Sequence, residues 1–199
     1  MNIILSTRNR SKVEQIKILF SDLDATVKSL DEAGISGEAV EDGTTLEENA
    51  LKKAMFAWEQ TVGWIMADDT GLFIDALGGQ PGIHAARWAG REAKTEDIMN
   101  FTLERLRGVP MGKRTATFMT VAVVISPDGD SRVFSGSVSG TLSTEPRTIC
   151  QIDMPYSAIF IPSGQEKVWA QMSIDEENAI SHRGQAFRQV RDFLSGILL

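Results

Sequence analysis

Two adjacent carboxylates, Asp68 and Asp69, are the side chains in this sequence best placed to do chemistry. They follow a short apolar run, residues 64–67, which has the length of a buried strand, and a polar-glycine turn, Thr70-Gly71, is expected directly after them. Carboxylates at the carboxyl end of a buried strand lie where open α/β sheets bind their ligands. Neighbouring strand residues point to opposite faces, so only one carboxylate can face a given site. The alternative is a turn in which Asp69 accepts from backbone N–H groups, and the dipeptide alone leaves both open.

A polar loop near the N-terminus is the second candidate site. It follows an expected strand, residues 2–6, and leads into a helix with an apolar stripe. A strand, a polar loop and a helix N-terminus together offer backbone N–H groups to phosphate. A solvated basic turn is the alternative interpretation. The side chains concerned are Thr7, Arg8, Asn9, Arg10, Ser11 and Lys12.

The start of the last helix is the third candidate. Ser181 is a good N-cap, which places His182 and Arg183 in the first turn. Positive side chains there oppose the helix dipole unless an anion binds, so the pattern indicates an anion site. An exposed first turn with both residues solvated is the alternative. A Ser-His-Asp hydrolase is excluded, because an adjacent Ser and His on one turn do not face each other and no nucleophile elbow is present.

The elements that must position these residues alternate between strands and helices. Thr45 and Glu48 form a capping box that opens a helix expected over residues 46–61. The turn at residues 127–130 joins two strand-like segments into a hairpin. Further strands are expected at 27–30, 114–126, 132–142 and 156–161, and further helices at 96–107 and 182–198.

Composition restricts the possible classes of protein. A chain of 199 residues with 42% hydrophobic content suits one α/β domain over residues 1–199. The net charge of −7 argues against a nucleic-acid polymer as partner, and a small polyanionic substrate would need a local basic cluster or a metal ion. Cys150 is the single cysteine, which predicts a reducing compartment. No apolar run suggests a membrane span or a signal peptide, so a cytoplasmic protein is expected.

An ordered string of residues around the aspartates resembles the inosine triphosphate pyrophosphatase family, which hydrolyses non-standard purine nucleoside triphosphates. The string comprises residues 67–72, 76–82 and 86–88. Thr7-x-Asn9-x-x-Lys12 is similar to the family's phosphate loop, and residues 181–183 are similar to its C-terminal signature. The resemblance implies an elongated three-layer α/β/α fold with a mixed central sheet, a cleft between two lobes, and a homodimer.

The same resemblance implies magnesium-dependent hydrolysis of a nucleoside triphosphate to the monophosphate and pyrophosphate. Glu41 and Asp69, with Asp68 beside them, are expected to hold Mg²⁺, and Asp69 is the expected general base. A solvated loop carboxylate is the alternative for Glu41. A nucleotide-binding protein without turnover is the rival function, and the presence of all these carboxylates and cations argues against it. The phosphates are expected to be held by Lys12, Lys53, His182 and Arg183. Asn49 and Thr70 are further expected substrate-binding residues.

The chain departs from the family pattern where the base would bind. The family's Phe-Gly-Tyr-Asp-Pro stretch is replaced by residues 154–158, in which Tyr156 is retained, Met154 takes the aromatic position and Ser157 the aspartate position. Glu177 stands where the family tends to have lysine. An ionised glutamate only accepts hydrogen bonds, which predicts reduced preference for ITP and XTP and a modified or amino-bearing base. The alternative is that Glu177 faces solvent or pairs with a cation and leaves selection unchanged.

Overall fold

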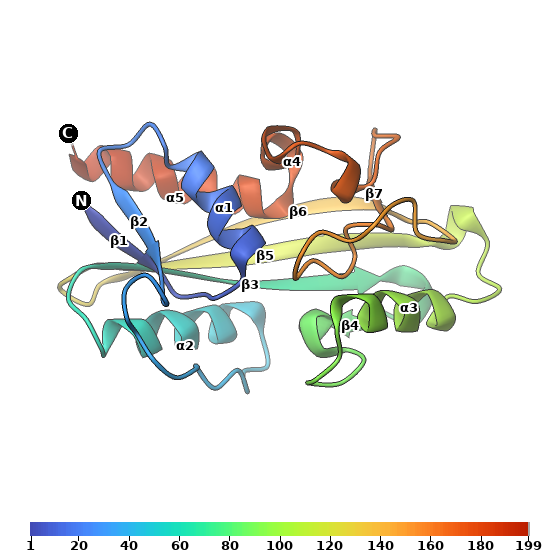
Figure 1. Ribbon diagram of the computed structural model, residues 1–199, viewed down its shortest axis with the longest axis horizontal. Helices are drawn as coiled ribbons and strands as arrows, with labels where there is room; N and C mark the ends of the chain where they lie inside the picture. Colours follow the sequence, from blue (N-terminus) through green and yellow to red (C-terminus); the bar gives the residue numbers. More distant parts are fainter. Residues whose placement is uncertain (199) are drawn as a thin grey trace.

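The computed structural model describes residues 1–198, and one mixed sheet with helices on both faces forms its centre (Figure 1). β1 pairs in parallel with β2 and β3, and the other strand pairs are antiparallel. The short strand β4 (Pro81–Gly82) pairs with β3 outside the main order. Across the sheet the order is β2 (Thr26–Ser29), β1 (Asn2–Leu5), β3 (Trp64–Ile74), β5 (Thr115–Ile125), β6 (Ser131–Leu142), β7 (Phe160–Pro162).

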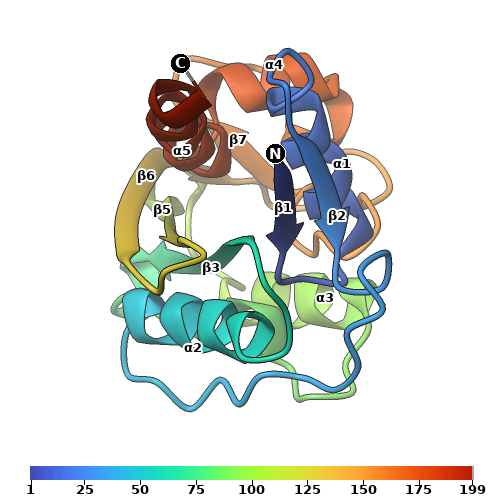
Figure 2. The ribbon, with the colours of Figure 1, turned by 90° about the vertical axis from the view of Figure 1, so that its left-hand side faces the viewer.

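The helices complete the three layers expected from the sequence. α2 (Leu46–Trp58) and α3 (Thr95–Arg105) cover one face, and α1 (Arg10–Leu19), α4 (Ile174–Ile180) and α5 (His182–Leu198) cover the other (Figure 1). Seen along its length, the sheet curls around α1 and α5 (Figure 2). Among the described helices, none combines the length and the apolar character that a bilayer span requires. The expected mixed α/β class and elongated outline are therefore confirmed, whereas the division into two lobes stays a prediction.

Apolar side chains form a core on each side of the sheet. The expected small-residue face of α2 is confirmed, since Ala50, Ala54 and Ala57 are completely buried against the sheet. On the opposite face, α1 and α5 bury Ile16 and Phe187 in one cluster with apolar residues of β1, β3 and β5. A third cluster fills the other end of the sheet, beneath β5 and β7, and includes Phe118, Phe160 and Trp169.

Strand β3 differs from its expected course in a way that matters for the site. It runs without interruption from Trp64 to Ile74, because β5 pairs with it from Ile65–Ile125 to Ile74–Ala116. The turn expected at Thr70-Gly71, and with it the turn interpretation of Asp69, is therefore wrong. Both aspartates lie in the middle of a paired strand, so their side chains must leave on opposite faces of the sheet.

The region before the last helix also differs from expectation. Residues 154–158 form a turn, with Ser157 N–H donating to Met154 O at 3.1 Å, so the expected strand begins only at Phe160. The sequence reading missed α4, although Ser173 and Glu176 form a capping box at its start. Because α4 ends at Ile180, Ser181 lies between two packed helices, and its hydroxyl accepts from Gly184 N–H as the expected N-cap of α5.

Candidate active site

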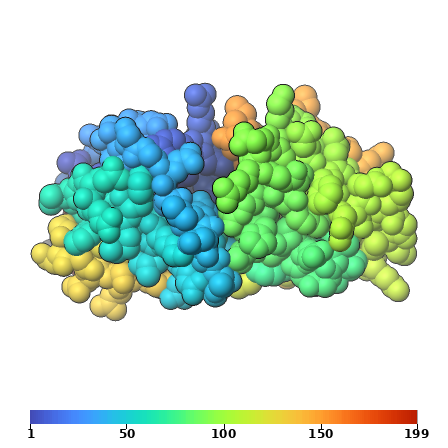
Figure 3. Space-filling model, turned by 90° about the horizontal axis from the view of Figure 1, so that it is seen from below, coloured from blue at the N-terminus to red at the C-terminus, as the bar shows by residue number. Residues whose placement is uncertain are grey.

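A cavity of about 340 Å³ lies where most of the candidate residues meet. Seen from below, a groove runs between the part of the surface that contains α2 and the part that contains α3 (Figure 3). Two further candidates, Asn49 and Asp68, are buried beneath the cavity wall. Arg10 and Ser11 do not line the cavity. The candidate residues that line it are Thr7, Arg8, Asn9, Lys12, Glu41, Lys53, Asp69, Thr70, Met154, Tyr156, Ser157, Glu177, His182 and Arg183.

Asp68 faces the layer that contains α1 and α5. Its Oδ2 lies 2.8 Å from Lys12 Nζ, 3.2 Å from Thr70 Oγ1 and 3.7 Å from Arg183 Nε. The carboxylate is completely buried. Burial favours the neutral acid, but the charges of Lys12 and Arg183 outweigh it and hold the pKa of Asp68 well below its usual range. Asp68 is therefore an anionic hub that fixes two cations, one from each helix.

Asp69 faces α2, on the opposite side of the sheet. Its Oδ1 lies 2.7 Å from Lys53 Nζ, and Asn49 Nδ2 donates to its Oδ2 at 3.4 Å. Lys53 Nζ also lies 3.6 Å from Glu41 Oε2. Burial lowers the pKa of Lys53, but the carboxylates around it outweigh that effect and raise the pKa above its ordinary value. Glu41 and Asp69 therefore both lie close to the protonated ammonium group of Lys53.

The arrangement around Lys53 is suited to a divalent cation. Among residues 1–198, no group of three or more His, Cys, Asp or Glu side chains converges as a complete protein cage. Magnesium is usually held by one or two carboxylates together with substrate phosphates. Glu41 and Asp69 fit that pattern, since both present oxygen atoms to one positive charge. Asp68 pairs with Lys12 on the other face of the sheet, and this placement argues against its expected role as a metal ligand.

The N-terminal loop has the strand, loop and helix arrangement expected for phosphate binding. Asn9 caps α1, because its Oδ1 accepts from Lys12 N–H at 2.9 Å. The loop is also tied to the far wall of the cavity: Asn9 Nδ2 donates to Asp153 O at 3.1 Å and Ser11 Oγ donates to Ile152 O at 2.6 Å. The helix N-terminus is therefore held at the cavity before any ligand binds.

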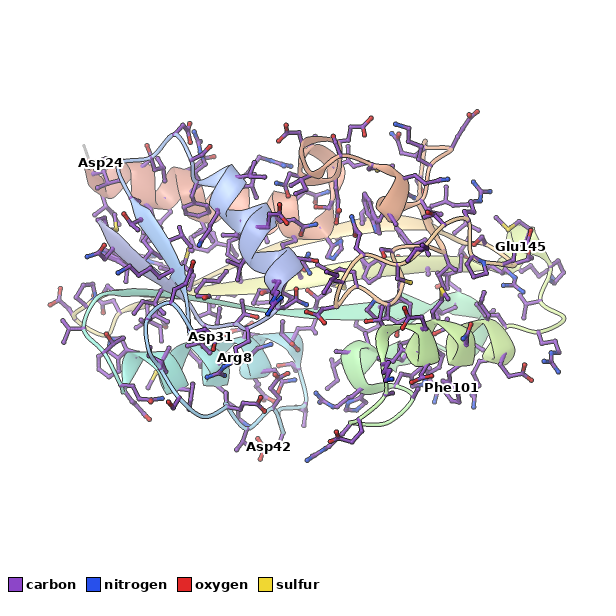
Figure 4. The ribbon with its side chains drawn as sticks, viewed as in Figure 1. Arg8, Asp24, Asp31, Asp42, Phe101 and Glu145 are labelled. Atoms are coloured by element: carbon purple, nitrogen blue, oxygen red, sulfur yellow. The ribbon has the colours of Figure 1, made fainter. Side chains whose placement is uncertain are left out.

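Arg8 and Arg10, which were expected to bind phosphate, are differently placed in the structure. Arg8 pairs with Asp31 at 2.9 Å (Figure 4) and donates to Ile35 O and Gly37 O, so it fastens the long loop before α2. Arg10 is exposed and lies outside the cavity. Lys12 and Lys53 remain as the cations closest to the two carboxylates.

His182 lies at the aromatic end of the cavity. Its ring stacks on Phe118 with 4.7 Å between centroids and 9° between planes, and the centroid of Trp169 lies 6.4 Å away. Burial, with the charge of Arg183, lowers the pKa of His182 well below its ordinary value, so the ring is neutral. The solvated first turn is therefore wrong, and a neutral imidazole does not fit the expected role of an electrostatic phosphate ligand.

Arg183 is fixed by residues that the sequence reading missed. Its Nη1 donates to Gln15 Oε1 at 2.6 Å, and the Gln15 backbone carbonyl accepts from Asn178 Nδ2 at 3.1 Å. Gln15 is buried although it is polar, and it lies three residues after Lys12 on the same face of α1. The three-residue spacing from Lys12 was the signal in the sequence that could have identified Gln15 as a site residue. Phe118, Gln151 and Trp169 also line the cavity, and no chemical pattern in the sequence marked them.

Glu177 is buried in the cavity wall with 3% of its surface exposed. Gln151 Nε2 donates to its Oε2 at 3.3 Å, and within residues 1–198 no Lys, Arg or His lies within ion-pair distance of its carboxylate. Burial raises the pKa of Glu177 above its ordinary value and outweighs Arg183 and the amides of Gln15 and Gln151, which favour the ionised form. The interpretation of Glu177 as a solvated or ion-paired side chain is therefore wrong.

The hydroxyl groups of Ser157 and Tyr156, at the same end of the cavity, are already paired with the protein. Ser157 Oγ donates to Met154 O at 2.7 Å and accepts from Gln151 N–H at 2.8 Å. Tyr156 Oη donates to Ala85 O at 2.8 Å. Both side chains hold the turn in place, whereas three buried atoms at this end have no partner within residues 1–198: Gln151 Oε1, Trp169 Nε1 and His182 Nδ1.

The chain is similar to known proteins over nearly its whole length, in sequence and in fold. The sequence model of the Ham1 family matches residues 3–193. A dITP/XTP pyrophosphatase of Thermoanaerobacter pseudethanolicus is 38% identical over 98% of this chain and 96% of its own, and one of Bacillus subtilis is 36% identical over 96% of each. The solved structure of a HAM1 protein from Coxiella burnetii has a TM-score of 0.85 and 31% identity, over 98% of this chain and 99% of that one. The Staphylococcus aureus Ham1 protein has a TM-score of 0.83 and 31% identity, over 99% of this chain and 100% of that one.

Proposed function

The chain belongs to the Ham1 family, and from this premise we propose that it is a nucleoside triphosphate pyrophosphatase acting on non-standard purine nucleotides. Such an enzyme converts dITP, ITP or XTP to the monophosphate and pyrophosphate and so removes them from the nucleotide pool. Relatives that match nearly the whole chain are named dITP/XTP pyrophosphatase. The observation that carries the proposal is the shared contact of Glu41 and Asp69 with Lys53 at the cavity, beside a helix N-terminus.

Each charged group has a role in this reaction. Lys12, Lys53 and the N-terminus of α1 bind the phosphates, because charge-assisted donors and free backbone N–H groups favour anions. Mg²⁺ held by Glu41 and Asp69 would neutralise phosphate charge and lower the pKa of a bound water. When a phosphate oxygen takes over the Lys53 ammonium, Asp69 Oδ1 becomes free to accept a proton from the attacking water. Asp69 is therefore the proposed general base.

A nucleotide-binding protein without turnover is less well supported. Such a protein has no need of a carboxylate that can take a proton, yet Asp69 is held at the cavity by Asn49 and Lys53. We also propose that the protein is a homodimer in the cytoplasm, on the strength of the family resemblance and of the location of the nucleotide pool. Light scattering on the purified protein tests the dimer.

The test of the proposed function is pyrophosphate release from a nucleotide panel. We expect no release in EDTA, recovery on addition of Mg²⁺, and a rate lower by about two to four powers of ten in Asp69→Asn, which cannot act as the base. Asp42→Asn is the matched control, because Asp42 is an exposed carboxylate that pairs with Lys52 near the same loop. Turnover in EDTA would refute the metal requirement. Full activity of Asp69→Asn with an unchanged pH profile would remove Asp69 from its role.

A further inference from the structure

Arg87 makes two contacts with Glu41, one of the two carboxylates suited to a metal ion. Arg87 Nη1 lies 3.7 Å from Glu41 Oε2, and Arg87 Nη2 donates to the Glu41 backbone carbonyl at 3.2 Å. One guanidinium group therefore contacts both the side chain and the main chain of the same residue. A planar fork of donors is suited to such a double contact, whereas a lysine ammonium acts as a point charge.

Glu41 has little local support of its own. It lies in residues 38–43, which form neither helix nor strand, and its side chain is 35% exposed. Among the described residues, the one other cation within ion-pair distance of its carboxylate is Lys53, at 3.6 Å. In the proposed reaction Lys53 passes to a phosphate oxygen, so Arg87 is the contact that remains on Glu41 once a nucleotide is bound.

The segment that carries Arg87 is fixed to the opposite wall of the cavity. In Figure 3 the segment that precedes α2 and the segment that follows β4 meet across the groove. Arg87 ends the one-turn helix Ala85–Arg87, and the carbonyl of the first residue of this helix accepts from Tyr156 Oη at 2.8 Å. The first two residues of the helix line the cavity, whereas Arg87 does not. Arg87 is therefore placed to orient Glu41 and not to bind the substrate.

We propose that Arg87 is a positioning residue that holds Glu41 at the metal position while Lys53 binds phosphate. The inference rests on the proposed function and adds a residue to it. The positive charge of Arg87 by itself would repel a divalent cation, so a role through charge alone and a positioning role predict opposite effects on metal binding. Loss of a residue that orients a metal ligand typically costs about 10–100-fold in metal affinity or activity.

The first test compares Arg87→Met with Arg87→Lys. In Arg87→Met the Mg²⁺ concentration for half-maximal pyrophosphate release from ITP should rise by about tenfold or more, while KM for ITP at saturating Mg²⁺ stays close to the parent value. Arg87→Lys keeps the charge but cannot make both contacts, so its value should lie between the two. Equilibrium titration of the proteins with Mn²⁺ should give the same order without turnover. Arg91→Met is the matched control, because Arg91 is an exposed arginine of the same segment.

Hydrogen exchange of the metal-free protein measures the positioning of Glu41 without any metal. Gly43 N–H donates to Asn49 Oδ1 at 2.9 Å, so its exchange reports opening of the segment that carries Glu41. Arg87→Met should speed this exchange by about threefold or more, the size expected for the loss of one net hydrogen bond. Arg91→Met should leave it unchanged.

The outcomes separate this inference from the proposed function. Tighter Mn²⁺ binding in Arg87→Met, with Arg87→Lys equal to the parent, would show that Arg87 acts through its charge alone and would overturn the proposal. Unchanged exchange at Gly43 in Arg87→Met would also overturn it, and so would a rise in KM for ITP without a change in metal dependence. If the parent releases pyrophosphate in EDTA, the metal requirement of the proposed function fails, and exchange at Gly43 alone then decides whether Arg87 holds Glu41.

Discussion

Replacement of Asp68 by Asn should destabilise the free protein strongly. The carboxylate is completely buried, 2.8 Å from Lys12 Nζ and 3.7 Å from Arg183 Nε. Asparagine has nearly the same shape but no charge, so both cations would stay buried without their counter-ion. Removing one partner of a buried ion pair typically costs about 3–5 kcal/mol. For a domain of this size each kcal/mol corresponds to about 2–4 °C, which gives a fall in Tm of about 6–20 °C.

Urea and thermal unfolding of three variants measure this effect. Asp31→Asn is the matched control, because Asp31 also pairs with an arginine at 2.9 Å but is 68% exposed, and such surface pairs are worth at most about 1 kcal/mol. The double variant Lys12→Met/Asp68→Asn removes one stranded cation and should recover part of the loss. Pyrophosphate should stabilise Asp68→Asn more than it stabilises the parent, since Lys12 is then free to bind an anion.

The dependence of stability on pH provides a second measure of the same carboxylate. The pKa of Asp68 is lower in the folded protein than in the unfolded chain. Its contribution is therefore complete above the unfolded value of about 3.9 and is lost as pH falls through the folded value. The parent should lose stability below about pH 4 more steeply than Asp68→Asn does. Two results would refute the conclusion that Asp68 holds Lys12 and Arg183 in place. One is an equal fall in Tm for Asp68→Asn and Asp31→Asn, and the other is the same pH dependence of stability in the parent and in Asp68→Asn.

Two further predictions concern α5. Burial lowers the pKa of His182, so protonation of the unfolded chain should reduce the free energy of unfolding below about pH 6.5, by up to about 1.4 kcal/mol per pH unit. Unfolding titrations of His182→Asn should lack this dependence on pH. The control variant His84→Asn should keep it, because His84 is exposed. A side chain added at Gly136 would place its Cβ in severe overlap with His182 O and 2.9 Å from Ala186 N. Gly136→Ala should therefore push α5 from β6 and lower the free energy of unfolding by about 1–3 kcal/mol, while Gly112→Ala, with open space around it, should stay close to the parent in urea titrations.

Local sequence patterns were sufficient for most of the fold. The N-cap Thr45, the hairpin turn at residues 127–130 and the N-cap Ser181 are each decided by neighbouring residues, and all three are confirmed. The capping box expected at Thr45 is only half formed, because the Glu48 carboxylate accepts from Thr44 N–H and not from Thr45 N–H. The opposite orientation of Asp68 and Asp69 was also predictable, because alternation along a strand does not depend on the rest of the chain. The error at Thr70-Gly71 has a tertiary cause, since pairing with β5 holds an otherwise turn-prone segment in the strand.

The state of the site residues could not be read in the same way. Glu177, His182 and Arg183 look like exposed polar residues in the sequence, and their burial depends on how α4 and α5 pack against α1 and the sheet. Burial keeps the ring of His182 neutral, and Phe118, which stacks on that ring, comes from the distant strand β5. Charge state and hydrogen-bond capacity are properties of such neighbours, so pattern matching located the site but not its chemistry.

The two halves of the cavity share two elements, α1 and β3, each of which contributes side chains to both. α1 carries Lys12, which contacts Asp68, and one turn later Gln15, which holds Arg183. Asp68 contacts both Lys12 and Arg183. The next residue, Asp69, faces the opposite side of the sheet, where it contacts Lys53. Arg183 is therefore linked to Lys12 by two routes, through Gln15 on α1 and through the carboxylate of Asp68 on β3, so a change at either cation alters the surroundings of the other.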